Sequence, residues 1–186
     1  MEVKGTAFLA RKQLVVAERG EAQFEALVRR FAEKEPVFRA PILATTILPI
    51  RPFLALNDEI LRELYEGDVQ SYLRVGEASA EWSLTQGPYR YLRESKSLEQ
   101  FAGMGKVLYG NFFTGGRAET KLVGDVVELR IDGIERDLRH PYFEYAICGY
   151  FKRGRELVGA KRVEMKRVRG FTQGDADVHY TFTLKR

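Results

Sequence analysis

Carboxylate pairs and a single thiol are the side chains that could support catalysis in this 186-residue sequence. Glu59 and Glu63 lie four residues apart, as do Glu77 and Glu81. On a helix this spacing puts both carboxylates on one face, but acid–base chemistry also needs a shared cleft and a shifted pKa. Carboxylates at this spacing belong to solvated helix faces far more often than to catalytic sites. Cys148 lies in an apolar run, which is typical of a buried thiol. Since Gly-x-Ser-x-Gly, Walker-type, His-Glu-x-x-His and Cys-x-x-Cys motifs are all absent from the sequence, we expect a protein that is not an enzyme and has no catalytic residues.

Aromatic side chains recur along residues 82–113 and 143–150. Most must belong to the core, but ligand pockets are also mostly apolar with a few polar groups. Glycines at positions 103, 105 and 110 cost about 1 kcal/mol each relative to alanine inside a helix, and they would leave space beside two of the rings. Loose packing is the alternative explanation. The predicted ligand-binding residues are Phe101, Gly105, Tyr109, Phe112 and Tyr145.

A basic segment at residues 161–169 is the strongest charge feature of the chain. Such a surface favours phosphate binding. Glu164 interrupts the segment, however, and no interleaved aromatic residues indicate base stacking. A charged sheet edge that discourages aggregation is the alternative, so we expect nucleic acid to be an unlikely partner. The residues proposed for anion binding are Arg162, Lys166, Arg167 and Arg169.

The elements that would position these residues begin with helices. Residues 21–34 carry apolar side chains at i, i+3, i+4 and i+7, which indicates an amphipathic helix. Four prolines between 36 and 52 exclude a long helix there and favour a connector with a short strand around Thr45 to Leu48. Further helices are predicted over residues 11–20, 53–67, 71–85 and 97–116, the last with Ser97 as its N-cap.

The hydrophobic period then changes. Residues 117–133 alternate polar and apolar side chains about Gly124 and Asp125, which predicts a β-hairpin. A long helix follows over 140–160, with Pro141 in its first turn, and two strands follow over 161–171 and 177–185. The expected fold is α+β, with a helical layer packed on a small antiparallel sheet and a C-terminal order strand-strand-helix-strand-strand. We expect residues 1–186 to form a single domain.

Composition sets broad bounds on the function. The chain is 45% hydrophobic and 30% charged, with a formal net charge of +4, which is ordinary for a globular protein and does not demand an anionic partner. Its one cysteine excludes an intrachain disulfide and fits a reducing compartment. The N-terminal residues lack the apolar core of a signal peptide, and no run of about 18 apolar residues is present. We therefore expect a cytoplasmic protein without a transmembrane segment.

Four stretches carry a resemblance to a known family: "VKGTAFLARKQLV…GEAQFEALV", "YRYLRES", "VLYGNFFTGGRAE" and "RGFTQGDADVHYTFTL". The chain resembles a myxobacterial paralogous family of unknown function, which is itself similar to the 4-vinyl-reductase and haem–nitric-oxide-binding superfamily. Lipid-binding subunits of vesicle-tethering complexes are related to that superfamily. The resemblance covers nearly the whole chain. It implies helices on a small antiparallel sheet, an apolar pocket between them, and a sensory role without turnover.

The chain departs from that superfamily at residues that hold metals. The 4-vinyl-reductase pattern often has cysteines around a Gly-Asp pair; here Gly174 and Asp175 are present, but Val178 replaces the second cysteine and none stands upstream. Without those thiolates a cysteine-based metal site is excluded. A haem sensor needs an axial imidazole on a helix, whereas His140 lies at a helix start and His179 on a strand. We therefore predict no metal site and no cofactor.

These observations predict a non-enzymatic sensory or regulatory domain that binds a small apolar or amphipathic ligand, including a lipid, between helices and sheet. A different class of function is a protein–protein interaction module without a ligand, acting as a homodimer or through a regulatory partner. Nucleotide or nucleic-acid binding through residues 161–169 is a further alternative, and an enzyme acting on a small aromatic substrate ranks below these.

Overall fold

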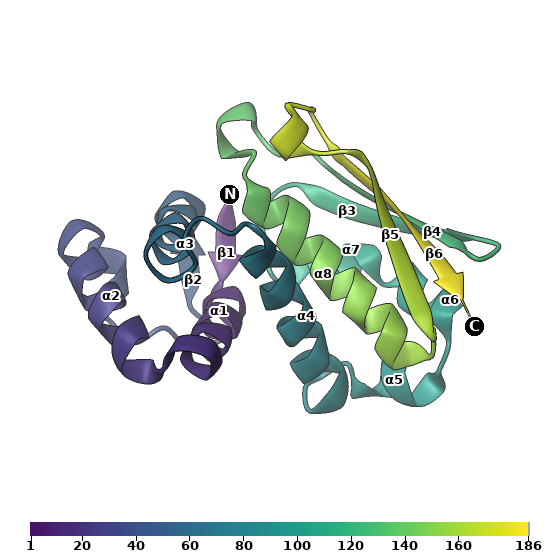
Figure 1. Ribbon diagram of the computed structural model, residues 1–186, viewed down its shortest axis with the longest axis horizontal. Coiled ribbons are helices and arrows are strands. Elements are labelled where there is room, and N and C mark those ends of the chain that lie inside the picture. Colours follow the sequence, from purple (N-terminus) through teal and green to yellow (C-terminus); the bar gives the residue numbers. More distant parts are fainter. Residues whose placement is uncertain (186) are drawn as a thin grey trace.

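A computed structural model describes residues 1–185. The N-terminal third is a helical unit (Figure 1). Its two short strands pair with each other in antiparallel orientation, so they tie the start of the chain to the connector that precedes the third helix. The elements of this unit are β1 (Glu2–Lys4), α1 (Gly5–Arg19), α2 (Glu21–Lys34), η1 (Pro36–Phe38), β2 (Ile47–Pro49) and α3 (Ile50–Leu64).

Local sequence explains the boundaries in this unit. Gly20 separates α1 from α2 with a backbone φ of 89°, a conformation that few residues other than glycine adopt. The predicted helix over 21–34 is confirmed, with Phe24 and Leu27 buried on its inner face. The short strand expected in the proline-rich connector forms at Ile47–Pro49. Pro52 falls in the first turn of α3, where its missing N–H has no intrahelical acceptor to lose.

Four helices form the middle of the chain: α4 (Gln70–Thr85), α5 (Arg90–Ser95), α6 (Leu98–Gly103) and α7 (Gly105–Gly110). The single helix predicted over 97–116 is wrong, because the chain leaves helical geometry at Met104 and divides that segment into α6 and α7. The predicted cap is confirmed, since the Ser97 hydroxyl accepts a hydrogen bond from the backbone N–H of Gln100 at 3.1 Å. The break lets Gly105 pack directly against the side chain of Thr120.

The C-terminal part confirms the predicted order strand-strand-helix-strand-strand and the α+β fold class. The four strands form one antiparallel sheet in the order β3-β4-β6-β5, with both edges formed by the outer strands of the two hairpins. The elements are β3 (Arg117–Val123), β4 (Val126–Asp132), η2 (Arg136–Leu138), α8 (Pro141–Val158), β5 (Arg162–Arg169), η3 (Phe171–Gln173) and β6 (Val178–Lys185).

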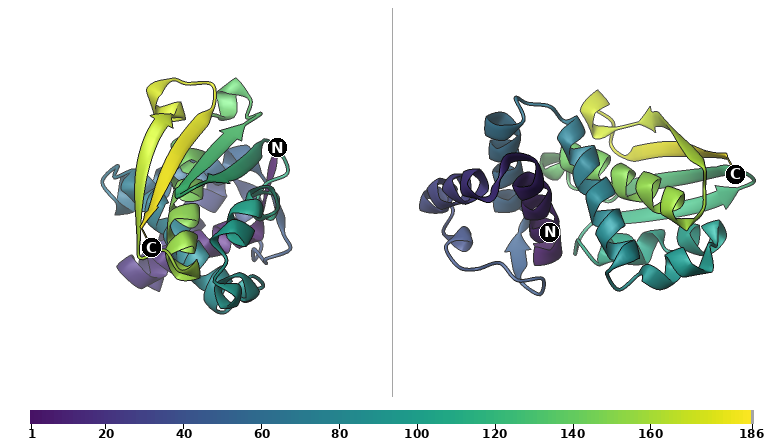
Figure 2. Two further views of the ribbon diagram at one scale, coloured as in Figure 1. Left: turned by 90° about the vertical axis from the view of Figure 1, so that its right-hand side faces the viewer. Right: turned by 60° about the horizontal axis from the view of Figure 1, so that its bottom comes forward.

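Helix α8 covers one face of this sheet (Figure 1). Alternate residues of the central strands point toward it, for example Leu129 on β4 and Tyr180 and Phe182 on β6, all of them buried. On its other side α8 packs along α4 (Figure 2). Among the described residues, no helix combines the length and the apolar character that crossing a membrane requires.

Candidate functional site

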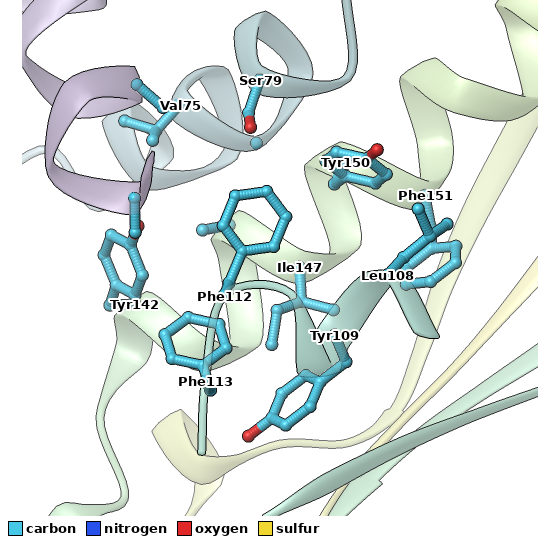
Figure 3. A pocket seen from close by; sticks show the side chains of 14 residues that line it. Val75, Ser79, Leu108, Tyr109, Phe112, Phe113, Tyr142, Ile147, Tyr150 and Phe151 are labelled. Carbon is cyan, nitrogen blue, oxygen red and sulfur yellow. The ribbon is translucent and has the colours of Figure 1, made fainter. Parts of the chain in front are cut away.

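A small apolar cavity of about 40 Å³ lies where α1, α4, α7 and α8 meet. Six of its fourteen lining residues are aromatic (Figure 3). The half-buried side chains Ala10, Ser79 and Phe112 lie at its more exposed side, whereas the rest of the lining is buried. The lining residues are Ala7, Ala10, Val75, Gly76, Ser79, Leu108, Tyr109, Phe112, Phe113, Tyr142, Ala146, Ile147, Tyr150 and Phe151.

Two glycines determine how closely the cavity walls approach. A Cβ added at Gly76 of α4 would stand 1.8 Å from the carbonyl oxygen of Ala146 on α8. A Cβ added at Gly149 of α8 would stand 2.1 Å from the carbonyl oxygen of Leu73 on α4. The backbones of the two helices are therefore in direct contact, which only glycine permits. Because α4 and α8 cannot separate without losing this contact, the space between them stays small.

Two hydroxyl groups of the cavity wall are hydrogen-bonded within the protein. The Tyr150 hydroxyl is hydrogen-bonded to Ser83 Oγ at 2.7 Å, and the Tyr109 hydroxyl donates to the carbonyl oxygen of Gly115 at 2.8 Å. Burial raises the pKa of Tyr109, Tyr142 and Tyr150 above the ordinary phenol value. These phenols are therefore neutral near pH 7, and the cavity offers mainly apolar contacts to an occupant.

The structure separates the five residues predicted to bind a ligand. Tyr109 and Phe112 line the cavity. Phe101 does not line it; its ring packs against Phe151 and beneath the buried guanidinium of Arg155. The break at Met104 is the reason, because Phe101 lies on α6 and Phe112 lies in the turn after α7, instead of both lying on one helical stripe.

Two further predicted residues also lie away from the cavity. Gly105 is buried against Thr120 of β3. Tyr145 lies on another side of α8, where its hydroxyl accepts a hydrogen bond from Arg167 at 3.3 Å. The hydroxyl groups of Tyr109 and Tyr145 are thus already hydrogen-bonded within the protein.

Eight lining residues outside the predicted set come from α4 and α8. Tyr142, Ala146 and Tyr150 repeat at four-residue intervals along one side of α8, which is a detectable helical stripe. Apolar character alone does not distinguish a stripe that packs in the core from one that lines a cavity. Gly76 gave no signal, because its role depends on a partner helix 70 residues away in the chain.

Three of the four residues predicted to bind anions are engaged with carboxylates. Arg162 Nε lies 3.5 Å from Glu164, Arg169 lies 2.9 Å from Asp177, and Arg167 is 3.1 Å from the buried Glu144. Among the described residues only Lys166 of this set has no ion-pair partner. Strand β5 therefore does not present the four residues as one cluster of free cations.

The stretch "RGFTQGD" after β5 is held by a buried carboxylate. Glu144 of α8 accepts hydrogen bonds from the Tyr180 hydroxyl at 2.7 Å and from the backbone N–H and hydroxyl of Thr172 at 3.0 and 3.1 Å. Gly170 N–H donates to Asp175 at 2.9 Å. This network closes the sheet onto α8, which is a structural role.

The carboxylate pairs of α3 and α4 also make ion pairs. Glu77 and Glu81 bridge to Lys152 and Arg153 on α8 at 2.8 and 2.7 Å. Glu63 pairs with Arg30 at 2.6 Å. Cys148 is fully buried, and burial raises the pKa of its thiol well above the ordinary value. These groups are occupied by salt bridges or enclosed in the core.

The cavity does not fit a haem group. Haem iron needs an axial imidazole, thiolate, thioether or tyrosinate, and no histidine, cysteine or methionine lines the cavity in the described part of the chain. His140 instead caps α8 and bonds to Asp58 at 2.8 Å, and His179 lies on β6 beside Glu128. The raised pKa of the three tyrosines opposes a tyrosinate ligand. Cofactor pockets occupy about 300–1,000 Å³, far more than the space between these helices.

Comparisons with known proteins bear on the fold. No protein-family model matches the chain, and no curated protein sequence matches it. Solved structures of H-NOX proteins do match the chain. An H-NOX protein from S. oneidensis in the Fe(II)NO ligation state is 12% identical, with a TM-score of 0.73 over 98% of this chain and 99% of that one. A second S. oneidensis structure, in the Fe(II) state, is 11% identical, with a TM-score of 0.74 over 98% and 96%.

A Tt H-NOX variant is also similar, at 12% identity and a TM-score of 0.71 over 98% of this chain and 95% of that one. Agreement over the full length of both chains at such low identity concerns the fold and not the function. The comparison therefore confirms the fold that the sequence resemblance implied, whereas membership of the haem–nitric-oxide-binding, 4-vinyl-reductase and myxobacterial families stays a prediction. The protein has the H-NOX fold.

Proposed function

We propose that this protein is a sensory domain that binds a small apolar molecule directly, without haem, in the cavity between α1, α4, α7 and α8. The cavity itself carries the proposal: it is apolar, lined by buried aromatic rings, and placed where the N-terminal helical unit meets the helix that supports the sheet. Apolar cavities of this kind stay dry and accept apolar guests such as xenon.

The size of the cavity restricts the ligand. About 40 Å³ is well below the roughly 150 Å³ of an engineered cavity that holds benzene. A lipid chain, which the sequence analysis included, does not fit this space. The cavity suits a diatomic gas, a rare gas or a hydrocarbon of very few carbon atoms.

The position of the cavity supplies a route from binding to response. Ala7 and Ala10 belong to α1, whereas Tyr142 and Ala146 belong to α8. An occupant would stabilise the arrangement in which these helices enclose it and would shift the population toward that arrangement. The surface formed by the helical unit and α8 would then report occupancy to a partner protein.

Xenon is the probe for a direct test. In amide correlation spectra of the labelled protein under xenon pressure, we expect shifts at the cavity residues and at α1 and α8. Ala146→Leu should abolish them because the added methyl groups fill the cavity. Ala32→Leu is the matched control, since Ala32 is equally buried, at 7% exposed, but lies on α2 away from the cavity.

Absence of xenon-induced shifts in the wild-type protein would refute the proposal, as would equal shifts in Ala146→Leu. The part of the proposal that excludes haem is tested by a separate measurement. Hemin added to the purified chain should give no Soret band of a ligated haem and no change in unfolding temperature. A stoichiometric Soret band would overturn the haem-independent part of the proposal while leaving the cavity itself intact.

A further inference from the structure

A second hollow lies at the far end of α4, away from the apolar cavity. It has a volume of about 220 Å³ and is formed by the last turn of α4 and by α5. Helix α5 lies near the C-terminal end of α8 (Figure 1). The lining residues are Leu84, Thr85, Arg90, Arg93, Glu94 and Lys96.

Three cations converge on this cleft. Arg90, Arg93 and Lys96 follow one another at three-residue intervals, and all three are exposed. Among residues 1–185 none of them forms an ion pair. This differs from β5, where Arg162, Arg167 and Arg169 are each engaged by a carboxylate.

Lys96 has an unusual backbone. It ends α5 with φ of 50° and ψ of 26°, the left-handed conformation that glycine or asparagine usually supplies at such a position. A lysine there costs stability relative to glycine, and the structure gives its ammonium no ion-pair partner in the described part of the chain. Residues that keep a disfavoured backbone conformation concentrate at functional sites. The strain therefore points to a use for the lysine side chain.

We propose that this cleft binds the phosphate group of a small phosphorylated molecule. Two guanidinium groups can each offer paired N–H donors to phosphate oxygens, and the lysine adds a compact positive charge. The volume accepts one phosphate or a diphosphate, while any larger organic part extends into solvent. The anion-binding role that the sequence suggested for residues 161–169 is thus assigned to residues 90–96.

Negative charge near the cleft restricts which anions can bind there. Glu94 is part of its lining, and the C-terminal end of α4 carries the negative end of the helix dipole. Both Glu94 and the helix end repel anions, so a carboxylate with a single negative charge is attracted only weakly to the cleft. A phosphate with two or more negative charges keeps a net attraction to the three cations.

Calorimetric titration with inorganic pyrophosphate tests the proposal. The wild-type chain should bind one equivalent, with affinity that falls as salt rises. Arg90→Gln/Arg93→Gln should weaken binding by about tenfold or more, the loss expected for removing two charge-assisted contacts. The matched control is Arg162→Gln/Lys166→Gln, which removes the same two charges from the strand and should bind as the wild type does.

Lys96→Gly separates binding from folding. Glycine relieves the left-handed backbone, so this variant should unfold at the same or a higher temperature and yet bind pyrophosphate more weakly. A wild-type protein that shows no saturable binding, or equal losses in both double variants, overturns the proposal. So does tight binding of an RNA oligonucleotide or of anionic vesicles with no binding of pyrophosphate. Xenon uptake is measured separately, so the two sites can fail independently.

Discussion

The buried arginine of α8 has an environment that its charged side chain alone does not predict. Arg155 carries a charged side chain on α8, yet it is fully buried, and its guanidinium carbon lies 4.3 Å from the ring centre of Phe182. Phe101 and Phe151 flank it, and burial lowers its pKa to about 9. Cation–π attraction, strongest where water is excluded, replaces the missing carboxylate.

His179 gives a prediction about pH. Its side chain is 12% exposed on β6, near Glu128 and Arg130 of β4 and near Arg169 and Asp177. Burial and the neighbouring arginine Arg130 lower its pKa below 6.5, so the folded state binds the proton less readily than the unfolded state. Stability attributable to His179 is therefore complete above about pH 6.5 and falls as the pH drops through that value.

The urea midpoint measured at pH 7.5 and pH 5 checks this expectation. The wild-type protein should lose more stability over this interval than His179→Gln, because the variant lacks the titrating imidazole. Equal losses would show that other groups control the acid response.

At the scale of elements, the contact between α4 and α8 is the feature on which the cavity depends. Gly76→Ala should destabilise the protein by about 1–3 kcal/mol, the cost of overpacking, although alanine is the better helix former by about 1 kcal/mol. The reason is that its Cβ meets a backbone carbonyl that cannot move alone.

Gly103→Ala is the matched control within α6. A Cβ at Gly103 meets nothing within 4 Å, so this variant should gain up to about 1 kcal/mol from helix propensity. Urea denaturation of both variants gives the comparison. A neutral or stabilising Gly76→Ala would mean that α4 and α8 are not in backbone contact.

The elements also show where prediction from sequence succeeded. The helix over 21–34, the hairpin about Gly124, and the long helix after His140 each carry a strong period or a specific turn residue, and each forms as expected. The prediction of one helix over 97–116 failed because the residues on both sides of Met104 are helical and carry apolar side chains at helical spacing, so the sequence pattern does not reveal the break between them. The decisive contact, Gly105 against Thr120, joins residues that lie on different elements.

At the scale of the whole molecule, one buried apolar cluster runs through the helical unit and the sheet unit. Interactions such as His140 with Asp58, at 2.8 Å, and Arg51 with Asp137 also join the two parts. We therefore propose that residues 1–186 form the single domain expected from the sequence. Calorimetry should show one cooperative unfolding transition whose calorimetric and van't Hoff enthalpies agree. Two resolved transitions would instead show that the helical unit unfolds separately.

Local periodicity, turn residues and spacing along the chain were enough to predict the order of the C-terminal elements and the fold class, and to show that common catalytic motifs are absent. The cavity-lining aromatic residues and the unpaired cations became visible once the elements were packed together in three dimensions. The ring centres of Phe112 and Tyr150 lie 6.0 Å apart although the two residues are far apart in the sequence, and Gly76 and Gly149 hold α4 against α8. Arg162, Arg167 and Arg169 of the basic strand form ion pairs with Glu164, Glu144 and Asp177, whereas Arg90, Arg93 and Lys96 form no ion pair among the described residues. Both outcomes depend on contacts between distant parts of the chain, which local pattern does not encode.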